Sequence, residues 1–306
     1  MNQPILSIIV VFYNMKREAP RTLYSLSSQY QQKVVSSEYE VIVIDNGSIE
    51  HLSEDLVKSF GQNFRLIRRD ASPSPAQAIN AGVEIAKGNL IMICIDGARM
   101  LSPKVVYFTL MAFKAFENPV VATIAYHLGP KLQNISMTEG YNQDIEDKLL
   151  ASVDWEGNGY SLFSISSFAG SSISGWFLPL GESNCLTISK SQFKGLNGFD
   201  ENFVSSGGGL VNPDFYKRAC EVAAPLVVLL GEGTFHQFHG GVATNVPRDK
   251  HPGRIFHNEY RQLRGRDYTP PGQEPILFGK LPKESMPFLN YSVEKLNTRE
   301  NNFKKI

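Results

Sequence analysis

The chain has no excess of charge of either sign, because 30 Lys and Arg residues balance 30 Asp and Glu residues among its 306 residues. A general nucleic-acid-binding protein usually carries a basic excess, so we expect no nucleic-acid partner. An anionic small molecule would have to be held by local groups. The apolar fraction of 42% is ordinary for a globular protein and predicts a sizeable core.

Cysteine is scarce as well. The three cysteines, Cys94, Cys185 and Cys220, are odd in number and far apart in the sequence. Such spacing fits neither a disulfide framework nor a zinc knuckle. We expect reduced cysteines that pack as small apolar residues.

Long hydrophobic runs are missing too. No apolar run approaches the ~20 residues that are needed to span a bilayer, so we expect no transmembrane segment. The N-terminus, MNQPILSIIVVFYN, has neither a basic n-region nor a small-residue cleavage site, which argues against a signal peptide. These absences favour a cytoplasmic location and leave peripheral attachment to a membrane open.

Buried strands and helices alternate over the first third of the chain. Continuous apolar runs predict strands that are buried on both faces, and apolar residues at helical spacing predict the helices between them. The predicted strands cover 6–12, 39–44, 64–68, 90–95 and 120–126. The first predicted helix begins at Pro20, and the others cover 52–60, 75–87 and 103–116. This alternation predicts an α/β fold with an open, mostly parallel sheet that helices flank on both faces.

The rest of the chain is less regular. Residues 129 to about 184 are rich in Gly, Ser and Asn, with one predicted helix near 144–153. Strands at 185–188 and 224–230 and a helix at 213–222 follow. We divide this single domain into residues 1–128, residues 129–246 and a C-terminal tail, 247–306.

Phosphate-binding glycine motifs are absent after the first strand, where the sequence reads NMKRE at residues 14–18. The chain has neither G-x-G-x-x-G at this turn nor G-x-x-x-x-G-K-[ST], which disfavours a dehydrogenase or a P-loop ATPase. A nucleotide diphosphate would instead need a divalent cation held by carboxylates. Ligands of open α/β sheets bind beyond the carboxyl ends of the strands, and Asp96 follows such a strand.

Four stretches in the first third together resemble the family-2 glycosyltransferases with the GT-A fold. Each is weak alone, but their order and spacing match over roughly residues 5–105. The stretches are LSIIVVFYN (6–14), TLYSLSSQ (22–29), YEVIVIDNGS (39–48) and NAGVEIAKG (80–88), the last followed by LIMICID (90–96). The resemblance implies an inverting transfer of a sugar from a UDP- or GDP-linked donor to the hydroxyl of a saccharide, lipid-linked or protein acceptor, with Mn²⁺ or Mg²⁺ as cofactor.

The resemblance also implies roles for individual residues. Tyr13 would lie against the base and ribose of the donor, Asp45 would accept hydrogen bonds from the base, and Asn80 would take part in nucleotide binding. Asp96 would coordinate the divalent cation that bridges the diphosphate. Other readings stay open, since Asp45 could bond its own turn and Asp96 could cap a helix.

The chain departs from the family where the metal is expected. Asp96-Gly97-Ala98 stands in place of Asp-x-Asp, so the second carboxylate is missing. Arg99 could neutralise part of the diphosphate charge, or it could be a plain surface arginine. GT-A enzymes often supply a further metal ligand from a late histidine, so His236 or His239 could complement Asp96.

The second half resembles the acceptor-side segment of the family more loosely, through the GFDE sequence at 198–201 and DFYKR at 214–218. The family's Glu-Asp pair, whose carboxylate serves many members as general base, falls on Val211-Asn212. Because Asn cannot be a base, we take Asp214, the nearest carboxylate, as the candidate, with Asp200 and Glu201 as weaker alternatives. The alternative role of Asp214 is to stabilise the first turn of a helix.

The tail between residues 248 and 266 is basic. It could close over the crevice as a lid and clamp the diphosphate, or form a solvated surface helix. Its basic residues are Arg248, Lys250, Arg254, Arg261, Arg264 and Arg266.

Two rival functions stay open. Ala98 and Asn212, which replace the family's carboxylates, are what a non-catalytic relative that binds a nucleotide sugar or a glycan would show. A nucleotidyltransferase would need a phosphate-binding loop after the first strand, where only Lys16 and Arg17 offer positive charge.

Overall fold

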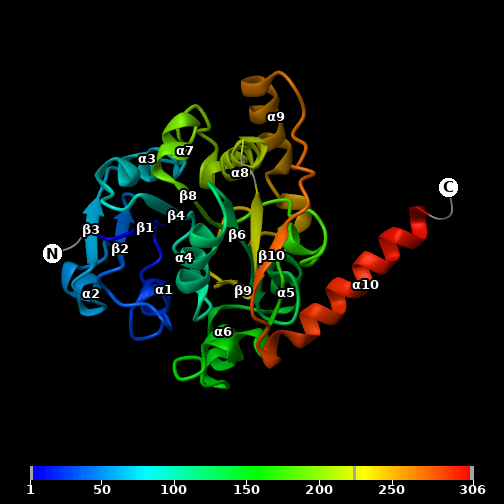
Figure 1. Ribbon diagram of the computed structural model, residues 1–306, viewed down its shortest axis with the longest axis horizontal. Coiled ribbons are helices and arrows are strands. Elements are labelled where there is room, and N and C mark those ends of the chain that lie inside the picture. The colour runs from blue at the N-terminus through cyan, green and yellow to red at the C-terminus, as the bar shows by residue number, and fades with distance from the viewer. Residues whose placement is uncertain (1–2, 223–224, 304–306) are drawn as a thin grey trace.

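A computed structural model describes residues 3–222 and 225–303. Within them the strands form one ten-stranded sheet, and the order along its main path is β10-β9-β6-β8-β4-β1-β2-β3 (Figure 1). These strands are β1 (Leu6–Phe12), β2 (Tyr39–Asp45), β3 (Phe64–Arg68), β4 (Leu90–Cys94), β6 (Val120–Leu128), β8 (Cys185–Ser189), β9 (Leu226–His236) and β10 (Ile276–Gly279). Two short strands, β5 (Arg99–Leu101) and β7 (Ser166–Phe168), pair with β9 and β6.

Strands β1 to β4 are parallel, and β8 is antiparallel to its neighbours β4 and β6. Leu6 of β1 is in register with both Tyr39 of β2 and Leu90 of β4. The carboxyl ends of these three strands therefore reach the same edge of the sheet, which brings the residues that follow them together.

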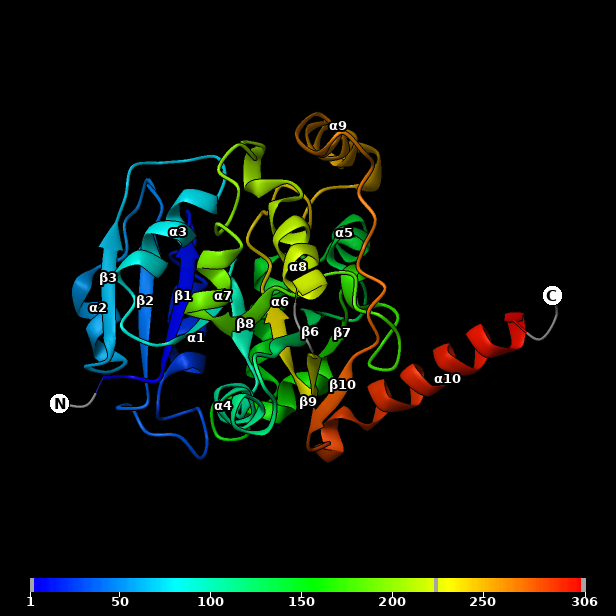
Figure 2. The same ribbon diagram turned by 45° about the horizontal axis from the view of Figure 1, so that its top comes forward.

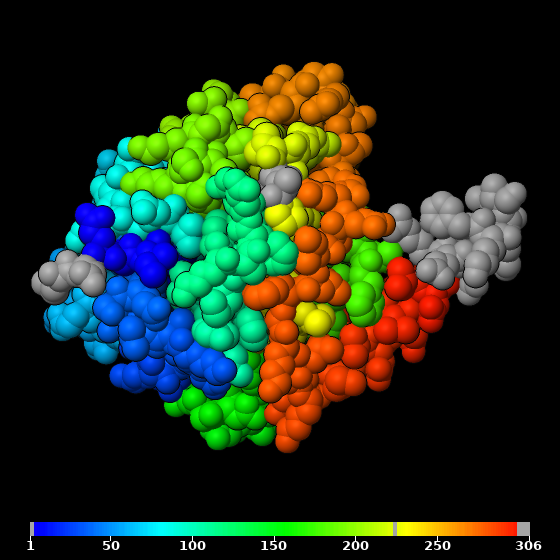
Figure 3. All heavy atoms as spheres, in the orientation of Figure 1, coloured from blue at the N-terminus to red at the C-terminus, as the bar shows by residue number. Residues whose placement is uncertain are grey.

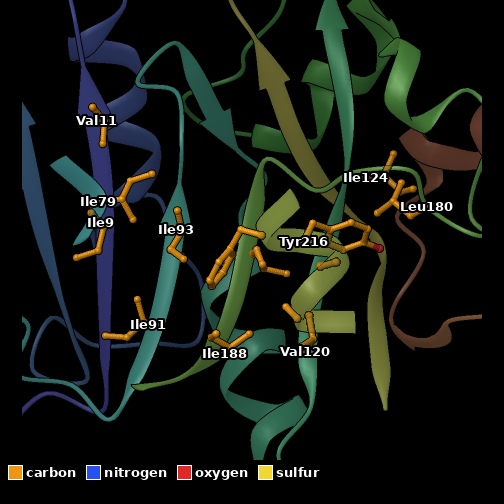
Figure 4. Close-up of a cluster of buried hydrophobic side chains, with 14 of the residues drawn as sticks. Ile9, Val11, Ile79, Ile91, Ile93, Val120, Ile124, Leu180, Ile188 and Tyr216 are labelled. Atoms are coloured by element: carbon orange, nitrogen blue, oxygen red, sulfur yellow. The ribbon is translucent and has the colours of Figure 1, made fainter. Parts of the chain in front are cut away.

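Strands β1, β2 and β4 are buried on both faces because helices cover both sides of the sheet (Figure 2). Ile9 and Val11 of β1 belong to one buried cluster, with Ile79 of a covering helix beside them (Figure 4). Their neighbours Ile8 and Val10 belong to the cluster on the opposite face. The first face carries α3 (Ala76–Ile85), α7 (Lys190–Gly195) and α8 (Val211–Val222), and the second carries α1 (Ala19–Leu26), α2 (Glu54–Ser59) and α4 (Val105–Ala115).

The predicted fold class is confirmed, and the elements of the first third end within a few residues of their predicted limits. The last predicted strand, 224–230, is wrong at its end, because β9 continues to His236. Gly231 lies inside β9 with φ +77°, where the pairing with β6 is irregular. A glycine at such a bulge lets a strand continue, although it looks like a turn in the sequence. Residue 224 lies outside the described part.

The second half holds more regular structure than its composition predicts. Between β6 and β8 lie α5 (Gln133–Ser136) and α6 (Gln143–Ala151), and the tail forms α9 (Gly253–Arg264), β10 and α10 (Met286–Phe303). The segment between α9 and α10 runs along the surface beside α4 (Figure 3), where Phe278 packs against Phe108 and Phe116. Helix α10 projects away from the body (Figure 1). No helix among the described residues is both long enough and apolar enough to cross a membrane.

Candidate functional site

A cavity of about 1020 Å³ opens beyond the carboxyl ends of β1, β2 and β4. Its walls come from the turns after these strands, from the loop before β8, from the start of α8 and from the loop after β9. The volume is at the upper limit of the ~300–1,000 Å³ typical of small-molecule sites, so it has room for more than one ligand. Its polar lining includes Tyr13, Asn14, Asn46, Asp96, Arg99, His127, Glu182, Asn184, Asn212, His239 and His251.

Asp96 meets two histidines at one wall of this cavity. Its Oδ2 lies 2.9 Å from Nε2 of His236 and 3.8 Å from Nε2 of His239. The three ligand atoms lie within 4.8 Å of one another, a spacing that suits a shared metal ion. Strand pairing brings the group together, because Arg99 of β5 is in register with His236 at the end of β9.

The hydrogen bonds around His236 fix which of its nitrogens carries the proton. Its Nδ1 lies 2.8 Å from Oε1 of Gln133, which also accepts from Asn245. The Gln133 amide nitrogen donates to the backbone carbonyl of His236, so the orientation of this amide is set. Nδ1 is therefore the donor, and the Nε2 lone pair faces the Asp96 carboxylate.

Two lone pairs that face each other at 2.9 Å need a positive charge between them. Metal-bound histidines usually donate their second N–H to a carbonyl, as His236 does to Gln133. Burial lowers the pKa of His236 to about 4, which keeps the ring neutral. Burial opposes ionisation of Asp96, but its neighbours, His239 and Arg99 among them, outweigh this effect and hold the pKa of this carboxyl far below its usual range. The residues thus fit a divalent cation.

Arg99 is no surface residue, since its exposed fraction is 5% and it lines the cavity. Its Nε lies 3.7 Å from Oδ2 of Asp96. Neither Nε nor Nη1 has a hydrogen-bond partner among the described residues. A buried cation without hydrogen bonds is costly, so the arrangement favours an anionic ligand beside Arg99.

At the nucleotide end, the structure brings Tyr13 to the cavity but not Asp45. Asp45 is fully buried and accepts hydrogen bonds from the backbone of Ser48 (2.9 Å) and Leu52 (3.1 Å) in its own turn. The prediction that Asp45 contacts the base is therefore not supported, and its alternative reading as a turn residue fits.

Sequence reasoning missed the next residue, Asn46, which does line the cavity. Its Nδ2 donates to the carbonyl of Ser72 at 3.1 Å, and its buried Oδ1 has no partner within the described chain. Successive side chains at a strand end point to opposite sides, so the Asp-Asn pair can send only one side chain toward the ligand. That alternation was the available signal.

Asn80 also lies elsewhere than predicted. Its side chain exchanges two hydrogen bonds of 2.9 Å with the backbone of Phe199, and its amide also donates to Glu201. It does not belong to the described lining of the cavity. Asn80 holds the loop after α7 rather than a nucleotide.

Asp214, the predicted base, is occupied by arginines. Its exposed fraction is 2%, and its two oxygens accept hydrogen bonds of 2.7–2.9 Å from Arg264 of α9 and Arg218 of α8. It is not among the described residues that line the cavity. The structure therefore does not support a base at Asp214, whose carboxylate joins α8 to α9.

A different carboxylate, Glu182, does line the cavity. It lies in the irregular stretch before β8, and its Oε1 accepts a hydrogen bond of 2.7 Å from Nδ2 of Asn212. Burial raises the pKa of Glu182, although Asn212 and Arg99 counteract part of this effect. No motif marks this residue in the sequence.

The basic tail does not clamp this cavity. Of its described residues, only His251 and Phe256 line it, and no Arg or Lys does. Arg264 pairs with Asp214 and Asp200, and Arg261 pairs with Asp267. Helix α9 instead holds the loop before α8, because Glu259 accepts hydrogen bonds of 2.8 Å from the backbone of Val204 and Ser205.

Comparisons with known proteins find one matching family and two relatives with partial matches. The family described as Glycosyl transferase family 2 matches residues 7–161. An uncharacterized glycosyltransferase of Haemophilus influenzae is 34% identical over 92 residues, 30% of this chain and 29% of that protein. The glycosyltransferase AglE of Haloferax volcanii is 31% identical over 97 residues, 31% of this chain and 30% of that protein. These matches span less than a third of either relative.

Solved structures resemble the fold over a longer stretch. Residues 1–349 of Staphylococcus aureus TarS match with a TM-score of 0.51 at 16% identity, over 76% of this chain and 60% of that one. The same protein in complex with UDP-GlcNAc matches with a TM-score of 0.52 at 17% identity, over 84% and 66%. At such identity the likeness speaks for the fold alone.

Proposed function

Since the chain belongs to glycosyl transferase family 2 and has the GT-A fold, we propose that it transfers a sugar from a nucleotide-diphosphate sugar to an acceptor hydroxyl. One observation carries the proposal. An ionised carboxylate, Asp96, meets the Nε2 lone pair of His236 beside His239 at the wall of a cavity large enough for two substrates.

Asp96, His236 and His239 would hold the divalent cation. Two imidazoles and one carboxylate suit Mn²⁺ better than Mg²⁺, which prefers an all-oxygen shell. A bound cation supplies Lewis acidity, which neutralises the diphosphate and stabilises it as a leaving group. Arg99 lies 3.7 Å from Asp96 and would add a second positive charge toward the diphosphate beside the cation.

The nucleoside would lie at the other end of the cavity. Tyr13 is half exposed there and offers a ring for stacking on the base. Asn46 offers a buried carbonyl oxygen that can accept a hydrogen bond from a base N–H. Uracil and guanine both present such a donor, so the donor class stays UDP- or GDP-linked. UDP-GlcNAc, the ligand in one TarS complex, is the first probe.

The proposed reaction is a single displacement with inversion at the anomeric carbon. The acceptor oxygen loses its proton to a carboxylate as it bonds to the anomeric carbon, and the bond from that carbon to the diphosphate oxygen breaks. The products are a glycoside and a nucleoside diphosphate. The acceptor, whether saccharide, lipid-linked or protein, would enter from the side of residues 129–246. A cytoplasmic location, with or without attachment to a membrane, stays a prediction.

The test is release of nucleoside diphosphate. The chain is incubated with UDP- and GDP-sugars, UDP-GlcNAc first, together with saccharide acceptors and Mn²⁺, Mg²⁺ or EDTA. We expect release with Mn²⁺ and its loss with EDTA. Binding of UDP-GlcNAc without any release would favour the non-catalytic rival, and formation of pyrophosphate from a nucleoside triphosphate would favour a nucleotidyltransferase.

A further inference from the structure

We propose that Glu182 is the general base that takes the proton from the acceptor hydroxyl. The inference rests on the proposed transfer and deepens it, because it names a catalytic carboxylate outside the helix on which the family resemblance predicts one. Its starting point is a hydrogen bond between Glu182 and Asn212, the residue that replaces the family's carboxylate.

Asn212 is the second residue of α8, at the edge of the cavity. Its Nδ2 donates to Oε1 of Glu182 at 2.7 Å and to the backbone carbonyl of Ser183 at 3.1 Å. Position 212 thus has no carboxylate of its own, and its amide instead binds the carboxylate of Glu182, which belongs to another segment. The carboxyl group stays beside the start of α8, although the residue that supplies it lies 30 positions earlier in the chain.

Only two carboxylates, Asp96 and Glu182, appear in the described lining of the cavity. Asp96 faces the imidazoles of His236 and His239, and under the proposed function it holds the metal ion. The remaining oxygen of Glu182, Oε2, has no hydrogen-bond partner in the described part of the chain. Glu182 therefore keeps one oxygen for a ligand while Asn212 fixes the other.

The surroundings of Glu182 also suit a base. Burial raises its pKa above that of an ordinary glutamate, whereas Asn212 and the charge of Arg99 favour its ionised form. A carboxylate that remains ionised but binds a proton more tightly than usual is a better acceptor of the hydroxyl proton. The positive charge of Arg99 favours the ionised form of both carboxylates, Asp96 and Glu182.

The step balances as follows in atoms and electrons. Glu182 accepts the proton of the acceptor hydroxyl, and the oxygen electron pair forms the new bond to the anomeric carbon. The bond from that carbon to the diphosphate oxygen breaks, and its electron pair leaves on the nucleoside diphosphate. Glu182 ends protonated and returns the proton to water.

Glu182→Gln keeps the shape of the side chain but removes the base. With UDP-GlcNAc, or the donor that the screen selects, we expect nucleoside diphosphate release to fall by roughly 10²–10⁴-fold. The shift in melting temperature on addition of UDP and Mn²⁺ should stay as in the wild type. Glu117→Gln is the matched control, because Glu117 is exposed and outside the described cavity lining, so nucleoside diphosphate release by this variant should be unchanged.

Rescue by azide distinguishes a general base from a residue with a merely structural role. Azide is already an anion and needs no base, so sodium azide should restore release by Glu182→Ala at least about tenfold and form a glycosyl azide. Asp96→Ala should not be restored. The same assay on His251→Asn tests the nearest rival base, since His251 also lines the cavity.

Release by Glu182→Gln within about threefold of the wild type, or loss of release in His251→Asn alone, would overturn the role of Glu182. The first result leaves the proposed transfer standing, because the wild type is active. A wild type that releases nothing from any donor would overturn both proposals.

Discussion

The two halves of the cavity use their carboxylates in opposite ways. On the donor side, Asp96 stands at the end of β4 where the family pattern predicts it and faces the cavity. On the acceptor side, Asp214 stands where we expected the base, yet Arg218 and Arg264 occupy both its oxygens. The carboxylate that lines the cavity on the acceptor side belongs to Glu182, in the irregular segment before β8.

The difference teaches that the place of a residue in an element does not by itself fix the direction of its side chain. The carboxyl ends of parallel strands lie at the crevice, yet of the neighbours Asp45 and Asn46 at the end of β2 only Asn46 lines the cavity. A residue in the first turns of a helix has several directions, and its direction depends on how the helix packs. Asp214 points toward α9 because Arg264 of that helix reaches it at 2.7 Å.

The largest effect should follow from Asp96→Asn on the donor side. The amide keeps one ligand oxygen but loses the charge that attracts the cation, so we expect release of nucleoside diphosphate to fall by about 10³-fold or more. The Mn²⁺-dependent part of the thermal shift with UDP should vanish. Asp144→Asn, an exposed aspartate of α6, is the control. An unchanged Mn²⁺-dependent shift would remove Asp96 from the metal site.

A smaller effect should follow from Asn46→Ala at the nucleoside end. The loss of one buried hydrogen-bond acceptor should weaken UDP binding by about tenfold, near 1.4 kcal/mol, and raise KM while leaving kcat almost unchanged. Isothermal titration with UDP and steady-state kinetics measure both. If KM for the donor did not change, Asn46 would have no contact with the nucleotide.

Asp214→Asn should act on stability and hardly at all on turnover. The change removes the charged partner of Arg218 and one of the two charged partners of Arg264, which keeps Asp200. We expect a loss of about 1–3 kcal/mol, less than for a fully buried pair because both arginines are partly exposed. Urea unfolding measures this loss. Turnover per folded molecule should stay within about twofold. A hundredfold loss of turnover at unchanged stability would return Asp214 to the role of base.

Glu232→Gln should leave turnover unchanged and alter only the pH dependence of stability. Glu232 of β9 is fully buried between Ser102 and Tyr160, and burial raises its pKa to about 7. The folded chain then holds this proton more tightly than the unfolded chain, whose glutamate has a pKa near 4.5. The wild type should therefore lose stability relative to the variant as the pH rises from about 4.5 to about 7.

Thermal unfolding of both proteins across this pH range checks the sign. The melting temperature of Glu232→Gln minus that of the wild type should increase with pH and level off above about pH 7. A constant difference would mean that Glu232 titrates alike in the folded and unfolded chains.

The sequence by itself determined the sheet and the donor side of the site. Continuous apolar runs such as 6–12 and 39–44 predicted strands buried on both faces, and the ends of parallel strands meet at one edge. That reasoning placed Tyr13 and Asp96 at the cavity. The family resemblance added the late histidines, and the structure brings His236 and His239 to Asp96.

Only the tertiary structure decided which polar neighbour faces the ligand. Asp45 and Asn46 are adjacent, yet the first completes a turn and the second lines the cavity. Asp214 faces away from the cavity because Arg264 of α9 binds it, and Glu182, which no sequence motif marks, lines the cavity where Asn212 of α8 binds it. These two contacts join residues that are 30 or more positions apart, and local sequence patterns carry no information about them.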